Sequence, residues 1–347
     1  LWPAKKTGTQ IDRLVSFVDM PKTWLSIVGA PVPDHMQGAV FLGPRTEPEN
    51  ECHFAFRGRM DERLENARAV CDKHHLYIRN YMPYVPWMQH LQYLWRMKAT
   101  QVWEEHVESG NAGEVQARFF APKGWAEELY DLRKDPDNVD NLIDNPEYRR
   151  IAERMRRHLR RKQLGIHDAG LLPEADMVRR AKENGPTIHD MVRNPRLYDL
   201  PALLDAADLA LGQERASLPE LETLLEREDA GLRYWGTVGC FLLCHTPKRI
   251  GALLQDESHE VRAMAAWLLI RTGEKQQGFE CLETLLENTS YATLAVLNIV
   301  DWMGGDGAAL MPTVRSLSLP RKSYEERMRQ ILLGKFSGRR QKRPAGG

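Results

Sequence analysis

The chain has 347 residues, which is enough for two domains that each bury their own hydrophobic core. Its 48 basic and 48 acidic residues cancel, so no overall electric field favours nucleic acid or an anionic membrane as a partner. No apolar run is long enough to cross a bilayer, and the five scattered cysteines form neither a disulfide framework nor a zinc pattern.

The first secondary structure is expected at residues 11–29, where apolar side chains recur at helical spacing on both sides of Pro21. We expect two short helices here, with Asp19 capping the second and Pro21 in its first turn. Residues 29–38 are rich in Gly and Pro and predict a loop.

Four stretches have the composition or the two-residue alternation of β-strands, namely 52–57, 67–71, 75–81 and 128–132. We expect them to form a small antiparallel sheet. A helix is predicted from Pro146 to about Lys162, with Asn145 as its cap. Its apolar stripe should cover one face of the sheet, and consists of Tyr148, Ile151, Met155 and Leu159.

Residues 82–123 form a long excursion that is dense in aromatic side chains. Its middle, about 85–110, is expected to be helical, with one apolar face that consists of Met88, Leu91, Leu94 and Trp95. Two hypotheses stay open for this insert. It packs against a catalytic half outside this chain, or it forms the wall of a substrate cleft.

Residues 164–197 hold several Gly and Pro residues and indicate a linker with short helices. A repeat of about thirty residues follows, which resembles HEAT-type helical hairpins. Leu-Leu pairs at 224–225, 253–254 and 285–286 each end a helix, and second apolar helices are expected at 232–243, 261–270 and 294–303. Residues 200–211 should cap the stack, and the basic residues 335–347 are expected to be a disordered tail.

Two phrases of the sequence resemble the sulfatases, the formylglycine-dependent sulfuric ester hydrolases of the alkaline phosphatase superfamily. The first phrase consists of Val18, Asp19, Thr23, Leu25, Gly29, Pro33, Gln37 and Gly38, and the second of Glu128, Leu129, Tyr130, Asp131, Asp135, Pro136, Asn141 and Leu142. One departure is Asn138, where the family usually has Glu. Within the family, the Arg79-Asn80-Tyr81 start and the aromatic insert look most like the sulfamidase-like (N-sulfoglucosamine sulfohydrolase-like) branch.

The resemblance implies attack on a sulfate ester by formylglycine, which the family makes from Cys or Ser in a Cys/Ser-x-Pro-x-Arg motif, beside a calcium ion. None of the five cysteines has that context. We therefore expect no catalytic residue and no metal ligand here, with the nucleophile and the calcium ligands upstream of Leu1. The chain also begins without Met, so we expect it to be a C-terminal fragment that is inactive without its N-terminal catalytic half. The resemblance implies a periplasmic or secreted parent.

The best local candidates for substrate contact lie on and after the first strand, and are His53, Arg57, Arg59, Asp61 and Glu62. Arg59 could bind a sulfate through paired hydrogen bonds, and His53 could transfer a proton. The alternative is a solvated cluster whose charges neutralise one another at a strand end.

The predicted helix at 146–162 is crowded with arginines, namely Arg149, Arg150, Arg154, Arg156, Arg157, Arg160 and Arg161. Such a face can bind phosphate backbones or sulfated polysaccharide. It can also be merely solvated or paired with acids.

The sequence thus predicts an α+β protein with a C-terminal sulfatase portion (1–163), a linker (164–197), HEAT-like repeats (198–334) and a tail (335–347). Our first hypothesis is part of a hydrolase that acts on a sulfated carbohydrate, such as an N- or O-sulfated amino sugar. The second is a non-catalytic interaction protein, in which the repeats bind a protein partner and the sulfatase remnant is a docking platform. A phosphatase or phosphodiesterase of the same superfamily is the third.

Overall fold

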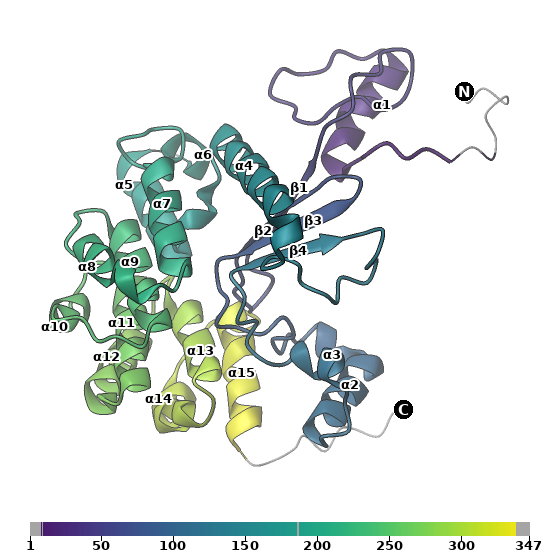
Figure 1. Ribbon diagram of the computed structural model, residues 1–347. Helices are drawn as coiled ribbons and strands as arrows, with labels where there is room; N and C mark the ends of the chain where they lie inside the picture. Colours follow the sequence, from purple (N-terminus) through teal and green to yellow (C-terminus); the bar gives the residue numbers. More distant parts are fainter. Residues whose placement is uncertain (1–7, 9, 186, 338–347) are drawn as a thin grey trace. The chain divides into compact units, whose positions relative to one another are not determined.

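The computed structural model describes residues 8, 10–185 and 187–337, which form two compact units (Figure 1). The sheet unit takes its residues from 1–56, 67–80 and 127–162, and the helical unit from 57–66, 81–126 and 163–347. The expected division near residue 163 thus coincides with the last boundary between the units. Two earlier segments also belong to the helical unit.

The sheet unit begins with the 3-10 helix η2 (Phe17–Asp19) and the helix α1 (Met20–Val28). Four strands follow, β1 (His53–Arg57), β2 (Ala67–Cys71), β3 (His75–Asn80) and β4 (Glu127–Asp131), and then η4 (Pro146–Tyr148) and α4 (Arg149–Ile166). The strands lie in the order β1-β2-β3-β4, and β3 pairs antiparallel with β2 and with β4. The predicted small sheet is confirmed, with strand bounds within a residue of those expected.

The predicted stripe on α4 also covers the sheet. Tyr77 and Leu129 point from β3 and β4 toward Met155, and all three side chains are at most 1% exposed. Tyr148 and Leu159 complete this core at the two ends of the helix stripe. Because the apolar stripe is buried, the opposite face of α4 faces solvent.

The first sulfatase-like phrase forms one hydrogen-bonded turn around Asp19. The Asp19 carboxylate, which is 2% exposed, accepts from the backbone amides of Ser16 and Ala39, both at 2.8 Å. Asp19 lies at the N-cap position of α1, as predicted. Its side chain makes no capping hydrogen bond to that helix, so this part of the prediction is wrong. Thr23 Oγ1 accepts from the Phe41 amide at 3.2 Å, which ties α1 to the loop after it.

The second phrase is a turn that Asn141 and Asp135 hold together. Asn141 Oδ1 accepts from the amide of Leu129 at 2.9 Å, and its Nδ2 donates to the Glu127 carbonyl at 3.0 Å. Asp135 Oδ2 accepts from the amides of Val139 and Asp140. Asn138 has a φ of 57°, a left-handed conformation that Asn adopts more readily than Glu, so the departure from the family's residue suits this backbone.

The helical unit starts with η3 (Leu94–Arg96), α2 (Lys98–Glu108) and α3 (Glu114–Arg118). The expected helix over 85–110 is wrong in extent, since only its second half is α-helical. Residues 83–88 instead run beside 119–124, with backbone bonds from Met88 to Phe119 and from Lys123 to Val85. Pro83 and Pro86 disfavour a helix there because proline lacks the amide that a helix needs.

The rest of the unit is helical and was largely predicted. Its helices are η5 (Ala169–Leu171), α5 (Glu174–Asn184), α6 (Ile188–Met191), α7 (Leu200–Leu211), η6 (Arg215–Ser217), α8 (Leu218–Leu224), α9 (Ala230–Leu242), α10 (Ile250–Leu253), α11 (His259–Thr272), α12 (Lys275–Glu287), α13 (Thr293–Trp302), η7 (Gly304–Leu310), α14 (Met311–Ser316) and α15 (Tyr324–Phe336). Helices α7, α9, α11, α13 and α15 contact one another in succession, and α8, α12 and α14 pack beside them (Figure 1). Two layers of helices therefore share one core.

Three expectations for this region need correction. Residues 164–197 contain the predicted short helices, but Leu171 and Met191 are each 1% exposed in the shared core, so this stretch is no linker. Its Pro173 and Gly185 mark the two ends of α5 instead. The first helix of the second repeat, α10, is only 4 residues long. The expected tail begins inside α15, and residues 338–347 lie outside the described part of the chain.

The aromatic insert joins the same core through Tyr84. Its ring lies 5.4 Å from the ring of Phe241, 5.5 Å from that of Trp267 and 6.4 Å from that of Trp302. Residues far apart in the sequence therefore build one aromatic cluster. Across 8, 10–185 and 187–337, no helix is both long enough and apolar enough for a membrane span.

Replacing Gly38 with Ala should loosen the turn around Asp19. Gly38 has a φ of 92°, and an added Cβ would lie 2.4 Å from the Val18 carbonyl oxygen. Strain of about 1–3 kcal/mol should speed hydrogen exchange of the Ala39 amide roughly tenfold or more. Gly58→Ala is the matched control, because nothing lies within 4 Å of its added Cβ. Equal exchange rates in the two variants would contradict this account of the turn.

Acid should weaken the sheet unit through Asp131. The Arg133 guanidinium and the Tyr148 hydroxyl donate to this carboxylate and lower its pKa to about 2. Because an unfolded Asp has a pKa of about 3.9, ionised Asp131 stabilises the fold above about pH 4, and this stabilisation is lost as the pH falls toward 2. Asp131→Asn should flatten the pH dependence of β4 amide exchange in that window. Asp140→Asn, at an exposed position, should leave it unchanged.

Candidate functional site

Arg63 anchors the segment 57–66, which carries most of the candidate residues, inside the helical unit. Its guanidinium is 2.9 Å from the Asp301 carboxylate and donates to Asn298 Oδ1 at 3.1 Å and to the His90 carbonyl. Asn298 Nδ2 in turn donates to the Glu62 carbonyl at 2.9 Å. Arg63 is 3% exposed, so this is a buried ion pair with surrounding hydrogen bonds.

A second buried ion pair joins the same segment to the aromatic insert. Lys123 Nζ lies 2.7 Å from Glu65 Oε1, and the two side chains are 1% and 4% exposed. The other Glu65 oxygen is 2.5 Å from Arg57 Nε, and Lys123 also lies 5.8 Å from the centre of the Trp87 ring. One carboxylate therefore neutralises two cations, and one of them is Arg57, a predicted site residue.

The other candidates in this segment also have protein partners. Arg59 Nε donates to both carboxylate oxygens of Glu174 at 2.9 Å, and its guanidinium lies 5.2 Å from the Tyr324 ring centre. Arg327 Nη1 is 3.7 Å from Asp61 and 3.8 Å from Glu62. The structure thus brings Arg59, Asp61 and Glu62 into one charge network. This arrangement favours the self-neutralising alternative over substrate contact.

His53 lies on β1 in the sheet unit and is half-buried. Its Nε2 atom is buried and has no hydrogen-bond partner among the described residues. A proton relay needs a second polar group within reach. The described residues provide none at this nitrogen.

Burial disfavours the thiolate form of two cysteines, Cys52 and Cys240. All five are free thiols, and burial raises the pKa of Cys52 to about 11 and that of Cys240 to about 12. Thiols with such pKa values are almost wholly protonated at neutral pH and react slowly. Among residues 8, 10–185 and 187–337, no three His, Cys, Asp or Glu side chains gather as metal ligands.

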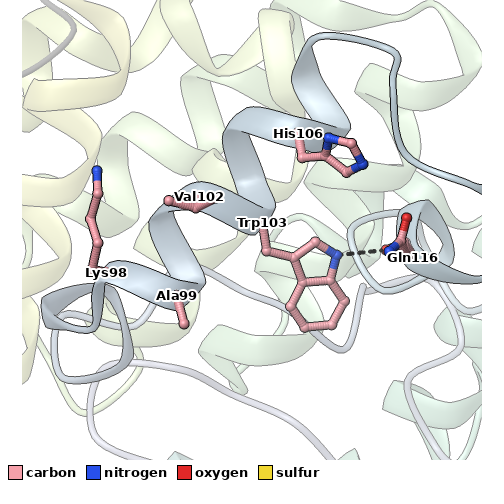
Figure 2. A pocket seen from close by; sticks show the side chains of 6 residues that line it. All are labelled: Lys98, Ala99, Val102, Trp103, His106 and Gln116. Carbon is pink, nitrogen blue, oxygen red and sulfur yellow. Dashed lines mark hydrogen bonds between the residues drawn. The ribbon is translucent and has the colours of Figure 1, made fainter.

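A hollow near aromatic side chains lies on α2 (Figure 2). It has a volume of about 580 Å³ and a mainly apolar lining that consists of Lys98, Ala99, Val102, Trp103, His106 and Gln116. Trp103 is held in place because its Nε1 donates to the Gln116 carbonyl at 3.1 Å and its ring packs 5.1 Å from that of Phe119. Figure 2 shows the indole of Trp103 beside Gln116 and below His106, with Lys98 farther along the helix.

This arrangement suits a ring-shaped ligand that carries negative charge. The flat indole can stack against a sugar ring, and Lys98 can attract a sulfate. The sequence analysis noted Trp103 only as part of an aromatic stretch. A usable signal was present, because Lys98, Val102 and His106 recur every four residues and lie on one helix face.

The comparisons with known proteins point to sulfatases for about half of this chain. No family model matches the sequence. Two curated proteins of Formosa agariphila, both named ulvan-active sulfatase, are similar to it. The first is 33% identical over 189 residues, which is 54% of this chain and 32% of the relative, and the second is 28% identical over 171 residues, 44% and 30% respectively.

The chain contains a sulfatase-related region and spans about a third of the length of these relatives. The first match covers 54% of the chain, more than the 163 residues that the two phrases indicated. The likeness therefore extends into the residues after Lys162, which belong to the helical unit.

Replacing Arg63 should destabilise the helical unit far more than replacing Arg59. Arg63→Ala leaves the Asp301 carboxylate with Lys335 alone, 2.6 Å away, and takes the donor from Asn298 Oδ1 and from the His90 carbonyl, which together should cost roughly 3 kcal/mol. Arg59→Ala removes a pair whose side chains are 31% and 42% exposed and should cost less than about 1 kcal/mol. Urea unfolding followed by tryptophan fluorescence measures both. Similar small losses in both variants would mean that the Arg63 pair contributes little.

Proposed function

We propose that this chain supplies the C-terminal part of a sulfuric ester hydrolase that acts on a sulfated polysaccharide. The observation that carries this proposal is the likeness of 54% of the chain to a protein named ulvan-active sulfatase. The two hydrogen-bonded turns around Asp19 and Asn141 support it, because both sulfatase-like phrases fold into well-bonded local structures.

The reacting group of this enzyme is proposed to lie in another part of the protein. The cysteines of this chain lack the Cys-x-Pro-x-Arg context, and burial raises the pKa values of Cys52 and Cys240 well above neutrality. A calcium ion in the enzyme, as the family resemblance implies, would take its ligands from the same part. We also propose a periplasmic or secreted location, in keeping with the resemblance.

An exposed apolar surface on the sheet unit supports the proposal that another part of the protein packs against it. Phe17, Trp24 and Val28 on η2 and α1 are 86%, 53% and 75% exposed. Clustered exposed apolar side chains usually mark an interface. We propose that this surface packs against the catalytic part of the hydrolase. An independent interaction protein, the alternative hypothesis, would leave it uncovered.

The hollow on α2 is proposed to hold one sugar unit of the polysaccharide. The indole of Trp103 provides the stacking surface, and Lys98 provides charge for a sulfate. The names of the relatives favour a polysaccharide over the N-sulfated amino sugar of the sulfamidase-like branch. An N-sulfated amino sugar, which the sulfamidase-like resemblance implies, is the narrower proposal for the substrate.

The helices from α7 to α15 are proposed to be a HEAT-type stack. The support is their arrangement in two contacting layers, in which α9, α11 and α13 are the second helices of three hairpins. The brevity of α10 is the departure from this pattern.

The activity test compares this chain with the product of its complete reading frame. The chain alone should release no sulfate from ulvan, because it has no reacting group. The complete product should release sulfate and should contain Cys or Ser in the x-Pro-x-Arg context. A complete product that lacks this motif and releases no sulfate would favour the interaction-protein alternative.

Trp103→Ala should weaken binding of a sulfated ulvan oligosaccharide roughly five- to tenfold, about 1–1.4 kcal/mol, through loss of the stacking surface. Lys98→Ala should weaken it less and only for the sulfated form. Isothermal titration calorimetry measures both. Tyr93→Ala is the matched control, since Tyr93 is 61% exposed in the same insert and does not line the hollow. Unchanged affinity in the Trp103 and Lys98 variants would remove the hollow from the site.

A further inference from the structure

The helix α4 concentrates positive charge in a chain that has no net charge. Residues 147–162 contain eight basic side chains and only two acidic ones, Glu147 and Glu153. Sequence alone leaves open whether these cations are paired within the protein. Six of the eight cations fall into two groups in the structure.

The first group forms ion pairs with carboxylates of the protein. Arg154 Nη2 is 2.6 Å from the Asp72 carboxylate, and Arg156 donates twice to Glu127 at 2.7 Å. Arg149 Nε is 3.3 Å from Glu153 Oε1. Arg154 and Arg156 therefore hold α4 on the sheet, whereas the pair of Arg149 lies within the helix.

The other group consists of Arg150, Arg157 and Arg161, which we call the arginine stripe. All three are exposed. Arg150 and Arg157 have no carboxylate partner among the described residues, and Arg161 Nη2 contacts only the His158 ring, at 2.9 Å from Nδ1. No acidic side chain therefore neutralises the stripe.

The spacing places the stripe on one line along the helix. Steps of seven and four residues return to nearly the same face, opposite the buried Met155 and Leu159. The three guanidinium groups thus span about 16 Å along a helix that its core side fixes in place. Like charges four residues apart, such as Arg157 and Arg161, disfavour the helix by a few tenths of a kcal/mol.

We propose that the arginine stripe binds a sulfated polysaccharide chain away from the reacting group. A linear chain with regularly placed sulfates matches a linear row of cations, and guanidinium groups form paired hydrogen bonds to such oxyanions. The stripe holds the polymer while successive sulfate esters react elsewhere. This inference rests on the proposed function only for its choice of polyanion.

Nucleic acid fits the stripe less well. Single strands bind where aromatic side chains alternate with cations and stack against the bases. The exposed face of α4 carries no aromatic residue, since its Tyr148 is 9% exposed and lies in the core. The charge pattern therefore matches a polymer that is recognised by its anions alone.

The test measures binding of ulvan and of chemically desulfated ulvan to the full chain. The triple variant Arg150→Glu, Arg157→Glu and Arg161→Glu should lower the affinity for ulvan about tenfold or more at 0.1 M salt. The slope of log affinity against log salt should fall by about 2–3. Desulfated ulvan should bind weakly to every variant.

The matched control reverses three exposed arginines of the helical unit, Arg196, Arg215 and Arg321, with the same change in net charge. It should change the affinity less than about twofold if local charge matters rather than net charge. Equal losses in both triple variants would overturn the stripe. Tighter binding of duplex DNA than of ulvan would replace the proposed ligand with nucleic acid.

The two proposals fail in different ways. If the stripe variant loses ulvan binding and the complete protein releases no sulfate, the proposal for the stripe holds and the proposal of a hydrolase fails. If the complete protein releases sulfate and the stripe variant binds ulvan as before, the proposal of a hydrolase holds and the proposal for the stripe fails. Circular dichroism of the triple variant confirms that α4 still folds, because none of the three side chains contacts the core.

Discussion

The buried pair of Arg63 and Asp301 is the interaction on which the helical unit depends. Arg63 belongs to a segment that follows β1, Asp301 lies on α13, and the His90 carbonyl between them belongs to the aromatic insert. One guanidinium thus connects three parts of the chain that are far apart in sequence. Burying two charges costs free energy, so such a pair specifies an arrangement more than it adds stability. The buried pair of Lys123 and Glu65 joins the insert to the same segment a second time.

The two functions of arginine in this protein follow from where its partners are. Arg63, Arg154 and Arg156 each meet a carboxylate and position an element of the fold. Arg150 and Arg157 carry the same charge with no such partner, and their charge is directed to solvent. The chain reaches neutrality as a whole while leaving one helix face positive. A count of charges along the sequence hides this difference.

Local patterns in the sequence predicted local structure well. Strand alternation located β2 and β3 correctly, and the spacing of Tyr148, Met155 and Leu159 predicted which face of α4 is buried. The failures have one cause. Gly and Pro in 164–197 indicated a linker, because the local sequence does not show that this stretch packs into the helical core. The helix expected from residue 85 does not begin there, because residues 83–88 pair with residues 119–124. The carboxylate partners of Arg59 and Arg63 are more than a hundred residues away, so no motif could reveal them.

The interleaving of the two units limits how such a protein could have evolved. The helical stack is completed by residues 57–66 and 81–126, which lie between strands of the sheet unit in the sequence. A single recombination event near residue 163 would move the helices without Tyr84, Lys123 or Arg63. The recipient would gain an array whose aromatic cluster and ionic centre were both incomplete. The helical array is therefore not a portable module.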